Sequence, residues 1–413
     1  MTDHGCHPTD LGTSGAGRHP PGGAAQHPLG DVGSHDAIAP LLAKVLPRVV
    51  GSWITASHGP QVGGSPGRQP AGEIGGRKRS GQVTEPGGDG DSGALHHRQA
   101  TAPIETPPPL AEVATVACVS ARVERVKVAE DVALSVRRWD GEAGDRPSFL
   151  LVHGLASNLH LWDGVAEALA GRSHPVAALD LRGHGTSDKP DGGYEFTTFT
   201  DDLIAVLDGL GLDHPVVAGQ SMGANVALEL AWRFPGRLRG VACIDGGWIE
   251  LRHRFPDWEH CAAALAPPPT TGRPFAAIEA MVRSRHPDWP EAGIQGALAC
   301  FELRSDGTVA PWLTGERHLA LLRALWEHRP SARFGEIPVP VLLVPAGDGS
   351  VADERREQVA AAAAALPRSE VHWMLGDHDL HAQHPEAVAA LLSSFSVELA
   401  VPQTAEPTKK IGG

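Results

Sequence analysis

The sequence is poor in cysteine and in long apolar runs. Its five cysteines are odd in number, lie far apart and form no Cys-x-x-Cys pair, so neither a disulfide framework nor a zinc site is indicated. It contains no run of about 18 uncharged apolar residues, the length that a membrane-spanning helix needs. The segment 1–10 has no basic stretch followed by an apolar one, so no secretory signal is predicted. We therefore expect a soluble protein of the reducing cytoplasm, without a membrane partner.

Positive charge is also in deficit. The chain has 35 Lys and Arg against 49 Asp and Glu, which gives a formal net charge of −14 at pH 7. Binding to a nucleic-acid backbone depends on clustered cations. The one short basic run, 77–79, lies among Gly and Ser, where a solvated charge cluster is the better interpretation. No nucleic-acid partner is expected.

Aromatic residues are almost absent from the first part of the chain. Residues 1–118 are rich in Gly, Pro, Ser and His, and Trp53 is their only Trp, Tyr or Phe. Such a segment buries too little apolar surface to offset the loss of chain entropy on folding. We predict a disordered low-complexity extension over 1–118, although 38–54 has the pattern of a short amphipathic helix interrupted by Pro47. The polar tail, 400–413, is predicted to be flexible.

From Val119 onward the composition changes to apolar runs. Two alternating runs read as a strand hairpin, and five short runs without alternation read as strands buried on both faces. These runs are 123–128 and 132–139, then 149–152, 176–179, 216–218, 241–244 and 341–344. Helix-like stretches lie between or after them, at 161–170, 199–210, 222–234, 358–366 and 385–395. The alternation predicts an α/β fold with a mostly parallel sheet that helices cover on both sides.

The interval 246–337 breaks this alternation. Its helix-like pieces lie at 258–265, 275–285 and 316–328, and proline clusters separate them. We interpret the interval as a mostly helical cap inserted before the penultimate strand of a core that comprises 119–245 and 338–399. No internal repeat is visible.

The strongest chemical signal lies in residues 216–230, with the sequence VVAGQSMGANVALEL. A strand-like run leads into Gly-Gln-Ser-Met-Gly, and a helix-periodic run follows. Gly-x-Ser-x-Gly in this setting is typical of a nucleophile elbow. Gly219 and Gly223 leave room where side chains would collide with the neighbouring strand and helix. Ser221 is the predicted nucleophile, at a helix N-terminus that favours developing negative charge.

A serine hydroxyl is a poor nucleophile until a base accepts its proton, and the base needs a partner that holds its tautomer. His378 lies in a Gly-containing loop directly before the last helical segment and is the predicted base. His381 and His384 are the rivals, for which a structural or solvated role is favoured. The three histidines also raise the question of a metal site, but no convergent Cys or carboxylate pattern supports one.

Three aspartates compete for the role of the orienting acid. Asp348 is preferred, because it follows the strand 341–344 at the carboxyl edge of the sheet, where active sites of such sheets collect. It also gives the chain order serine, acid, histidine. Asp245 is a real competitor because it directly follows 241–244, a strand expected beside the elbow strand. Asp353, in the same loop as Asp348, is the weaker alternative.

An anionic tetrahedral intermediate needs positioned N–H donors. The backbone amides of Leu155 and Met222 are the predicted oxyanion hole. His153, two residues before Leu155, is predicted to fix its loop by hydrogen bonding rather than to act as a second base. A later turn, braced by Asp180 and Arg182, is likewise interpreted as structural.

These motifs resemble those of the α/β-hydrolase superfamily, specifically its capped single-domain bacterial members. The resemblance covers about 123–396 and rests on HGLASN at 153–158, DLRGHGTSD at 180–188, GQSMG at 219–223 and GDHDLH at 376–381. It implies an eight-stranded sheet, a Ser-His-Asp triad, the two amides named above and no cofactor. The chain departs from its relatives around Asp348, since they often carry another residue or two between the glycine and the acid.

Branches of the superfamily differ at the elbow, in the cap and at the position of Leu155, so these residues can be compared with the present sequence. Haloalkane dehalogenases and epoxide hydrolases place an aspartate at the elbow, where this chain has Ser221. Epoxide hydrolases also carry tyrosines in the cap, whereas the only tyrosine here, Tyr194, precedes the elbow. Cofactor-free haloperoxidases commonly have an aromatic residue where Leu155 stands, which argues against, without removing, a perhydrolase.

The predicted function is hydrolysis of a carboxylic ester or thioester of a small to medium apolar substrate through an acyl-enzyme intermediate. Aromatic residues of the cap are candidates for an apolar pocket: Trp248, Phe255, Trp258, Phe275, Trp289, Phe301, Trp312 and Trp326. Five arginines leave open an anionic substrate, and with it a C–C bond hydrolase or lyase that uses the same triad: Arg252, Arg254, Arg283, Arg285 and Arg304. The alternative from another class is a non-catalytic binding protein of the fold.

Overall fold

The computed structural model describes residues 121–140, 145–347 and 353–399. The predicted extension, 1–118, the tail, 400–413, and the preferred acid, Asp348, lie outside the described residues.

A sheet of eight strands forms the centre of the described chain, with the order β1-β2-β4-β3-β5-β6-β9-β11. β1 and β2 form the predicted antiparallel hairpin, β2 pairs antiparallel with β4, and all later pairs are parallel. The strands are β1 Ala121–Ala129, β2 Val132–Trp139, β3 Phe149–Val152, β4 Val176–Leu179, β5 Val216–Gln220, β6 Gly240–Ile244, β9 Val341–Val344 and β11 Ser369–Val371. The predicted mostly parallel, eight-stranded sheet is confirmed.

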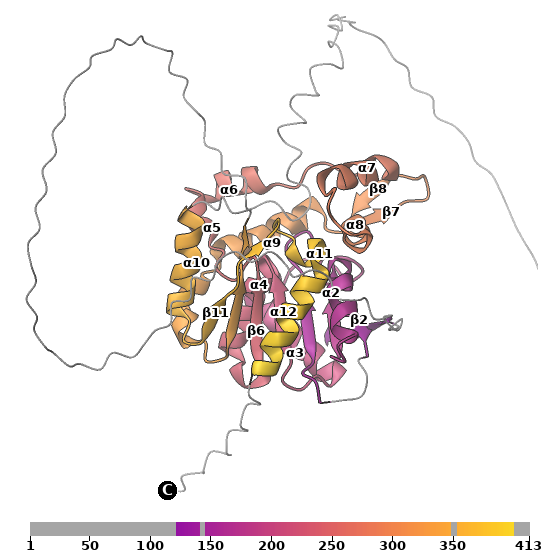
Figure 1. The fold of residues 1–413 in the computed structure, drawn as a ribbon. Coiled ribbons are helices and arrows are strands. Elements are labelled where there is room, and N and C mark those ends of the chain that lie inside the picture. The colour runs from indigo at the N-terminus through magenta and orange to yellow at the C-terminus, as the bar shows by residue number, and fades with distance from the viewer. Residues whose placement is uncertain (1–120, 141–144, 348–352, 400–413) are drawn as a thin grey trace, which may run out of the picture. The chain divides into compact units, whose positions relative to one another are not determined.

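The central strands are apolar throughout because helices cover both faces of the sheet. Phe149 and Leu151 of β3 belong to one hydrophobic cluster, and Leu150 and Val152 belong to the other. The first cluster also contains side chains of α2 and α12, and the second contains side chains of α3, α4 and α10 (Figure 1). The helices are α2 Asp163–Ala170, α3 Phe196–Leu210, α4 Met222–Arg233, α10 Asp353–Ala365, α11 Leu380–Gln383 and α12 Pro385–Glu398.

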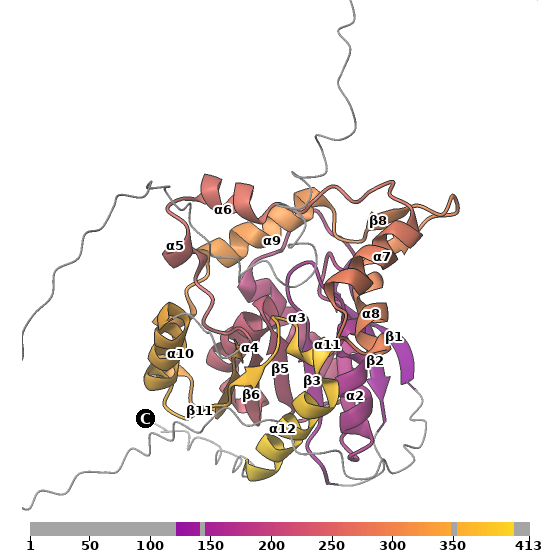
Figure 2. The same ribbon diagram turned by 45° about the horizontal axis from the view of Figure 1, so that its top comes forward.

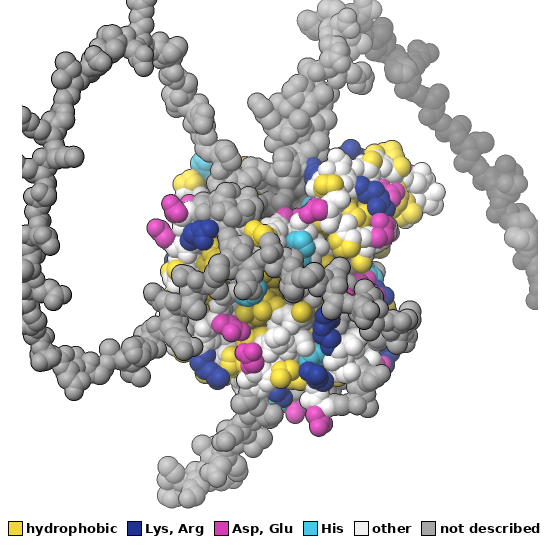
Figure 3. Space-filling model, viewed as in Figure 1, with side chains coloured by type: hydrophobic (Ala, Val, Ile, Leu, Met, Phe, Trp, Pro, Cys, Tyr) yellow, Lys and Arg dark blue, Asp and Glu magenta, His cyan; other side chains and the backbone are white. Residues whose placement is uncertain are grey.

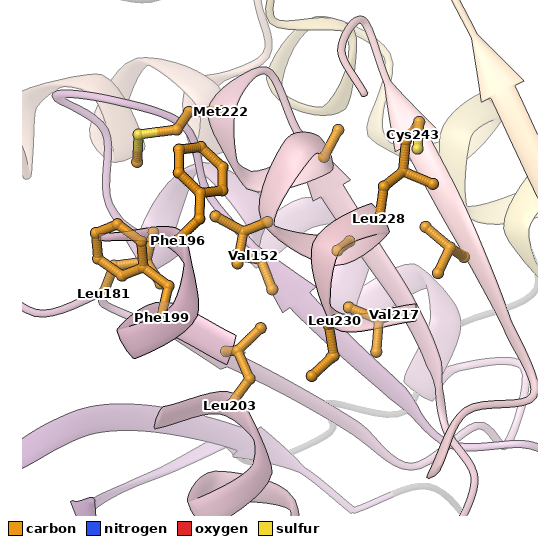
Figure 4. Packing of buried hydrophobic residues seen from close by; sticks show 14 of the residues in the cluster. Val152, Leu181, Phe196, Phe199, Leu203, Val217, Met222, Leu228, Leu230 and Cys243 are labelled. Carbon is orange, nitrogen blue, oxygen red and sulfur yellow. The ribbon is translucent and has the colours of Figure 1, made fainter. Parts of the chain in front are cut away.

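The second cluster holds the elbow helix in place. Figure 4 shows Phe196 and Phe199 of α3 and Leu230 of α4 around Val152 and Val217 of the neighbouring strands. All of these side chains are buried. Burial of a Val, Leu or Phe side chain contributes roughly 1.5–3 kcal/mol, so the helix that follows the elbow is firmly attached to the sheet.

The chain between β6 and β9 lies on one side of the sheet, at the carboxyl ends of its parallel strands (Figure 2). Its elements are α5 Leu251–Arg254, α6 Trp258–Leu265, α7 Phe275–Arg285, α8 Glu291–Leu298, β7 Phe301–Leu303, β8 Val309–Pro311 and α9 Gly315–Glu327. The helices expected at 258–265 and 275–285 have these bounds. α8 and the β7–β8 hairpin were not predicted, because α8 starts directly after the proline cluster 287–290, which we interpreted as a separator.

Short elements complete the described chain. They are the 3₁₀ helices η3 Leu159–Trp162, η4 Pro235–Arg237, η5 Pro330–Ala332 and η6 Phe334–Glu336, and the two-residue strands β10 Ala346–Gly347 and β12 Met374–Leu375, which pair in parallel. Among the described helices, none has both the length and the apolar character needed to span a bilayer. On the face in Figure 3, basic side chains of the described residues stand among acidic ones rather than forming one continuous basic area.

Candidate active site

Ser221 occupies a sharp turn between β5 and α4. Its backbone has φ 54° and ψ −120°, a conformation that side-chain-bearing residues rarely adopt. The turn is tight, since a Cβ on Gly219 would lie 2.2 Å from the carbonyl oxygen of Gly223. A Cβ on Gly223 would lie 2.4 Å from the carbonyl oxygen of Val152. Both glycines are therefore required sterically, as the sequence predicted.

The loop after β3 lies against this turn. A Cβ on Gly154 would be 3.0 Å from the Cβ of Ser221, so the two backbones nearly touch. Within the described chain, neither the Leu155 nor the Met222 amide donates a hydrogen bond to another residue. Both N–H groups thus lack an acceptor among the described residues, as donors of an oxyanion hole must before substrate binds; their role stays a prediction.

His153 fixes that loop. Its Nδ1 lies 2.7 Å from the Gly154 carbonyl oxygen, and its Nε2 accepts the Leu181 amide at 3.0 Å. Both contacts are satisfied by the neutral tautomer with its proton on Nδ1. Burial lowers the pKa of His153, although the charge of Asp180 and the Gly154 carbonyl oppose that effect. The predicted structural role is confirmed.

The turn after β4 is braced as expected. One carboxylate oxygen of Asp180 accepts the Leu159 amide and the other accepts the Thr186 amide, both at 2.9 Å. Arg182 does not pair within the turn; it forms two hydrogen bonds of 2.6 Å with Asp202 of α3. Asp180 therefore braces the turn as predicted, whereas the prediction for Arg182 is wrong, because its guanidinium bonds Asp202 of α3 instead.

His378 is buried next to the elbow. Its carbonyl oxygen accepts the side-chain amide of Gln220 at 3.1 Å, so the histidine loop contacts the residue that precedes Ser221. Its Nδ1 lies 2.5 Å from Oδ2 of Asp245. Of the three competing aspartates, the structure thus brings Asp245 to His378. Asp353 is exposed at the start of α10, and Asp348 lies outside the described residues.

Asp245 is held on both of its carboxylate oxygens. Oδ2 faces His378, while Oδ1 accepts the Ala346 amide at 2.8 Å and forms an ion pair with Arg355 of α10. The carboxylate side chain is 1% exposed. Asp245 has a positive φ of 45° at the end of β6, as Ser221 has at the end of β5. Sequence reasoning missed Arg355 altogether.

Burial and ion pairing shift the pKa values of Asp245 and His378 in opposite directions. Burial raises the pKa of the Asp245 carboxyl, but the hydrogen bond and charge of His378, together with Arg355, outweigh burial and lower it. Burial lowers the pKa of His378, and the Asp245 carboxylate outweighs that effect and raises it. The pair is thus suited to hold a proton on the imidazole when a neighbouring group supplies one.

The rival histidines have other surroundings. His381 is fully buried with its ring 4.4 Å from that of Trp162, and neither of its nitrogens has a hydrogen-bond partner among the described residues. Burial lowers the pKa of His381 to about 3, so the ring is uncharged at neutral pH. His384 caps the start of α12 with its backbone. In the described chain, no group of three or more His, Cys, Asp or Glu is arranged to hold a metal ion.

The histidine loop also contacts the cap. Trp289 donates its indole N–H to Asp377 at 2.9 Å, and Asp377 in turn accepts the Asp379 amide at 2.8 Å. Asp379 is buried, and burial raises the pKa of its carboxyl to about 7. The sequence offered no signal for this link, because Trp289 lies 88 positions from Asp377.

A pocket lies between the oxyanion loop and the cap. Its lining is mostly apolar and contains neither Lys nor Arg. It is formed by Ala156, Ser157, Gly185, Pro267, Pro268, Thr270, Cys300, Phe301, Pro311, Trp312, Leu313 and His318. Phe301 and Trp312 therefore have the predicted location, whereas the buried Trp289 and Trp326 belong to hydrophobic clusters.

The cap arginines have other contacts. Arg252 stacks over the Trp326 ring at 5.3 Å, and Arg283 is paired with Glu279 and Glu291. None of the five arginines considered in the sequence lines the pocket.

Comparison with known proteins gives consistent results. A family model described as alpha/beta hydrolase fold matches residues 147–291. The 2-(acetamidomethylene)succinate hydrolase of Mesorhizobium japonicum is 29% identical over 220 residues, which are 52% of this chain and 73% of that protein. An esterase of Mycobacterium tuberculosis is 34% identical over 137 residues, 33% of this chain and 44% of the esterase, so the match spans less than half of that relative.

Solved structures extend the likeness beyond the region of the family model. A crystal structure of E-2-(acetamidomethylene)succinate hydrolase superposes with a TM-score of 0.57 at 25% identity, covering 67% of this chain and 99% of that one. Sheet order, elbow and relatives agree: the chain has the α/β-hydrolase fold, and its residues 147–291 match the family model of that fold.

Proposed function

We propose that this protein hydrolyses a neutral carboxylic ester or thioester of a small to medium apolar molecule, with Ser221 as nucleophile, His378 as base and Asp245 as orienting acid. The observation that carries the proposal is the 2.5 Å contact between His378 Nδ1 and Asp245, in a loop that is hydrogen-bonded to the residue before Ser221. A buried carboxylate on Nδ1 leaves Nε2 as the nitrogen available to a serine proton.

The reaction proceeds in two halves. Ser221 Oγ attacks the substrate carbonyl carbon, and its proton passes to Nε2 of His378. The oxyanion that forms is stabilised by the Leu155 and Met222 amides. When the tetrahedral intermediate collapses, His378 returns the proton to the departing alcohol or thiol. Water then attacks the acyl-enzyme with His378 again as the base, which releases the acid and restores Ser221.

The pocket supports a neutral substrate. An anionic substrate buried without a cation loses its hydration without compensation. Among the described residues no Lys or Arg lines the pocket, and the Lys189 ammonium beside it already donates to the Gly185 and Ser187 carbonyl oxygens and lies over the Trp312 ring. Hydrolysis of a carboxylate-bearing substrate remains the second candidate, because the Mesorhizobium japonicum relative acts by its name on a succinate derivative. The same triad would serve a C–C bond hydrolase acting on such a compound.

Labelling with a fluorophosphonate probe tests the proposal. The full-length protein is expected to become labelled and to hydrolyse short p-nitrophenyl esters. Ser221→Ala removes the nucleophile and is expected to abolish labelling and to reduce kcat on the order of 10⁶-fold. Ser396→Ala, a buried serine of α12 whose hydroxyl bonds the Ser393 carbonyl, is the matched control and retains both activities.

Two outcomes would redirect the proposal. Turnover of a vinylogous diketone acid without turnover of esters would establish the second candidate. A wild-type protein that neither becomes labelled nor hydrolyses any of these substrates would identify a non-catalytic binding protein of the fold.

A further inference from the structure

We propose that Arg355 is a positioning residue for the hydrolase reaction: it holds the Asp245 carboxylate in the orientation that faces His378 and adds a fixed positive charge beside this pair. The role rests on the proposed function, in which Asp245 is the acid of the triad. Arg355 reaches the pair from α10, an element that contributes no group to the reaction itself.

The two carboxylate oxygens of Asp245 have different partners. Oδ2 of Asp245 faces Nδ1 of His378, and Oδ1 faces the Ala346 amide and Nη2 of Arg355. Rotation of the carboxylate about its Cβ–Cγ bond would break contacts on both oxygens together. The guanidinium thus opposes the rotation that would disconnect the acid from the base.

The ion pair between Asp245 and Arg355 is largely shielded from water. The Asp245 side chain is 1% exposed and the Arg355 side chain 22%, so water screens the pair only from the outer side. A guanidinium stays charged at every pH at which the protein is folded. It therefore supplies a constant positive charge beside the proposed triad, whereas a histidine there would titrate.

Three charged groups and one uncharged histidine surround His378, and they come from four parts of the chain. Asp245 follows β6, Arg355 lies on α10, Asp379 neighbours His378 in its own loop, and His381 lies on α11. The two carboxylates raise the pKa of His378, and Arg355 lowers it. Asp245 alone would make the imidazole a stronger base that stays protonated to higher pH. By neutralising part of that carboxylate charge, Arg355 leaves the imidazole free to accept the serine proton at lower pH.

The test compares two adjacent arginines in the full-length protein. Arg355→Gln removes the proposed contact, Arg355→Lys keeps the charge, and Arg356→Gln is the matched control. Arg356 is the next residue of α10, is exposed and stacks over the Trp373 ring at 5.4 Å. The readouts are kcat/KM for a p-nitrophenyl ester, the fluorophosphonate labelling rate across pH, and the melting temperature.

We expect Arg355→Gln to move the acidic limb of both pH profiles to higher pH and to lower the plateau kcat by up to about 10²-fold, the cost of a misplaced catalytic group. Arg355→Lys is expected to return the acidic limb of the pH profiles to its wild-type position. Arg356→Gln is expected to leave both the acidic limb and the plateau kcat as in the wild type. Profiles of Arg355→Gln that coincide with those of Arg356→Gln would overturn the proposal. A melting temperature lowered without any shift of the limb would also overturn it, because a merely structural ion pair gives that result.

A double-mutant cycle asks whether Arg355 acts through Asp245. If it does, the plateau rate of Asp245→Asn/Arg355→Gln is no lower than that of Asp245→Asn alone. A double variant that is slower than Asp245→Asn alone would contradict the proposal that Arg355 acts through Asp245.

A measurement without turnover separates this inference from the proposed function. The imidazole signal of His378, assigned by its loss in His378→Gln, is titrated by NMR in wild type and in both Gln variants. Arg355→Gln is expected to raise the titration midpoint relative to Arg356→Gln. An unchanged midpoint refutes the role of Arg355, whether or not the protein hydrolyses esters.

Discussion

Two side chains of the site sit on strained turns that interlock. Ser221 and Asp245 have φ values of 54° and 45° at the ends of the neighbouring strands β5 and β6. A Cβ on Gly246 would lie 2.3 Å from the carbonyl oxygen of Ser221, so the two turns pack directly against each other. Each strained residue costs of order 1–3 kcal/mol. The surrounding sheet maintains both, which places the hydroxyl and the carboxylate at the same edge.

Replacement of the acid tests the residue assignment. Asp245→Asn removes the carboxylate that holds the His378 tautomer and is expected to lower kcat on the order of 10⁴-fold. Because that carboxylate raises the pKa of His378, its removal lowers this pKa, and the acidic limb of kcat/KM moves to lower pH. The measurement is a pH profile of ester hydrolysis.

Asp348→Asn is measured beside Asp245→Asn to compare the two candidate acids. In the sequence, Asp348 directly follows β10, and β10 pairs with β12, which precedes the loop that carries His378. We expect Asp348→Asn to keep kcat within a few-fold of the wild type. A larger loss in Asp348→Asn than in Asp245→Asn would return the role to the acid that we preferred from the sequence.

At the scale of elements, the elbow depends on the close packing of β5 on α4. Gly219→Ala places a methyl group 2.2 Å from the Gly223 carbonyl oxygen, and backbone atoms there have no free volume to move into. We expect a loss of about 1–3 kcal/mol in the free energy of unfolding, as overpacking typically costs, together with loss of labelling. Urea denaturation measures the first effect and the fluorophosphonate probe the second.

Gly236→Ala provides the control for this change. Nothing lies within 4 Å of a Cβ on Gly236 in the 3₁₀ helix after α4. Its stability is expected to match that of the wild type within about 0.5 kcal/mol, as for other surface substitutions. Equal stabilities of the two alanine variants would show that the elbow tolerates a side chain at residue 219.

At the scale of the whole described molecule, hydrogen bonds join the segment between β6 and β9, the predicted cap, to the core. Asn158, in the oxyanion loop region, donates to the Gly296 carbonyl of α8 at 2.9 Å, and Trp289 donates to Asp377. The predicted cap and the core are thus connected at two places: at Asn158, in the segment after β3, and at Asp377, next to His378. The apolar pocket lies at the first of these connections.

A matched pair of substrates tests the chemistry of that pocket. p-Nitrophenyl butyrate and mono-p-nitrophenyl succinate have acyl chains of equal length and differ in a terminal carboxylate. We expect kcat/KM to favour the butyrate at least about 10-fold, since one unpaired charge in an apolar site costs more than 1.4 kcal/mol. Faster hydrolysis of the succinate would overturn the preference for a neutral substrate and would point to Lys189, whose ammonium contacts the lining residues Gly185 and Trp312.

The sequence by itself predicted most core elements and the strained turn that carries Ser221, the proposed nucleophile, because both depend on local patterns. The continuous apolar runs 149–152, 176–179 and 341–344 are strands with those bounds, as burial on both faces requires. Gly219-Gln220-Ser221-Met222-Gly223 specifies its turn within five residues. The short cap elements, α8 and the β7–β8 hairpin, lacked such a local signal. The extension 1–118 and the cytoplasmic location stay predictions.

Only the tertiary structure decided which side chains lie around His378, the proposed base. Asp245 and Asp348 both follow a strand that ends at the carboxyl edge of the sheet, so local sequence does not distinguish them. Asp245 lies 133 positions from His378, and Arg355 lies 110 positions from Asp245. Contacts over such separations arise from the order of strands in the sheet and from how α10 packs beside it. Residue type and local spacing carry no information about either.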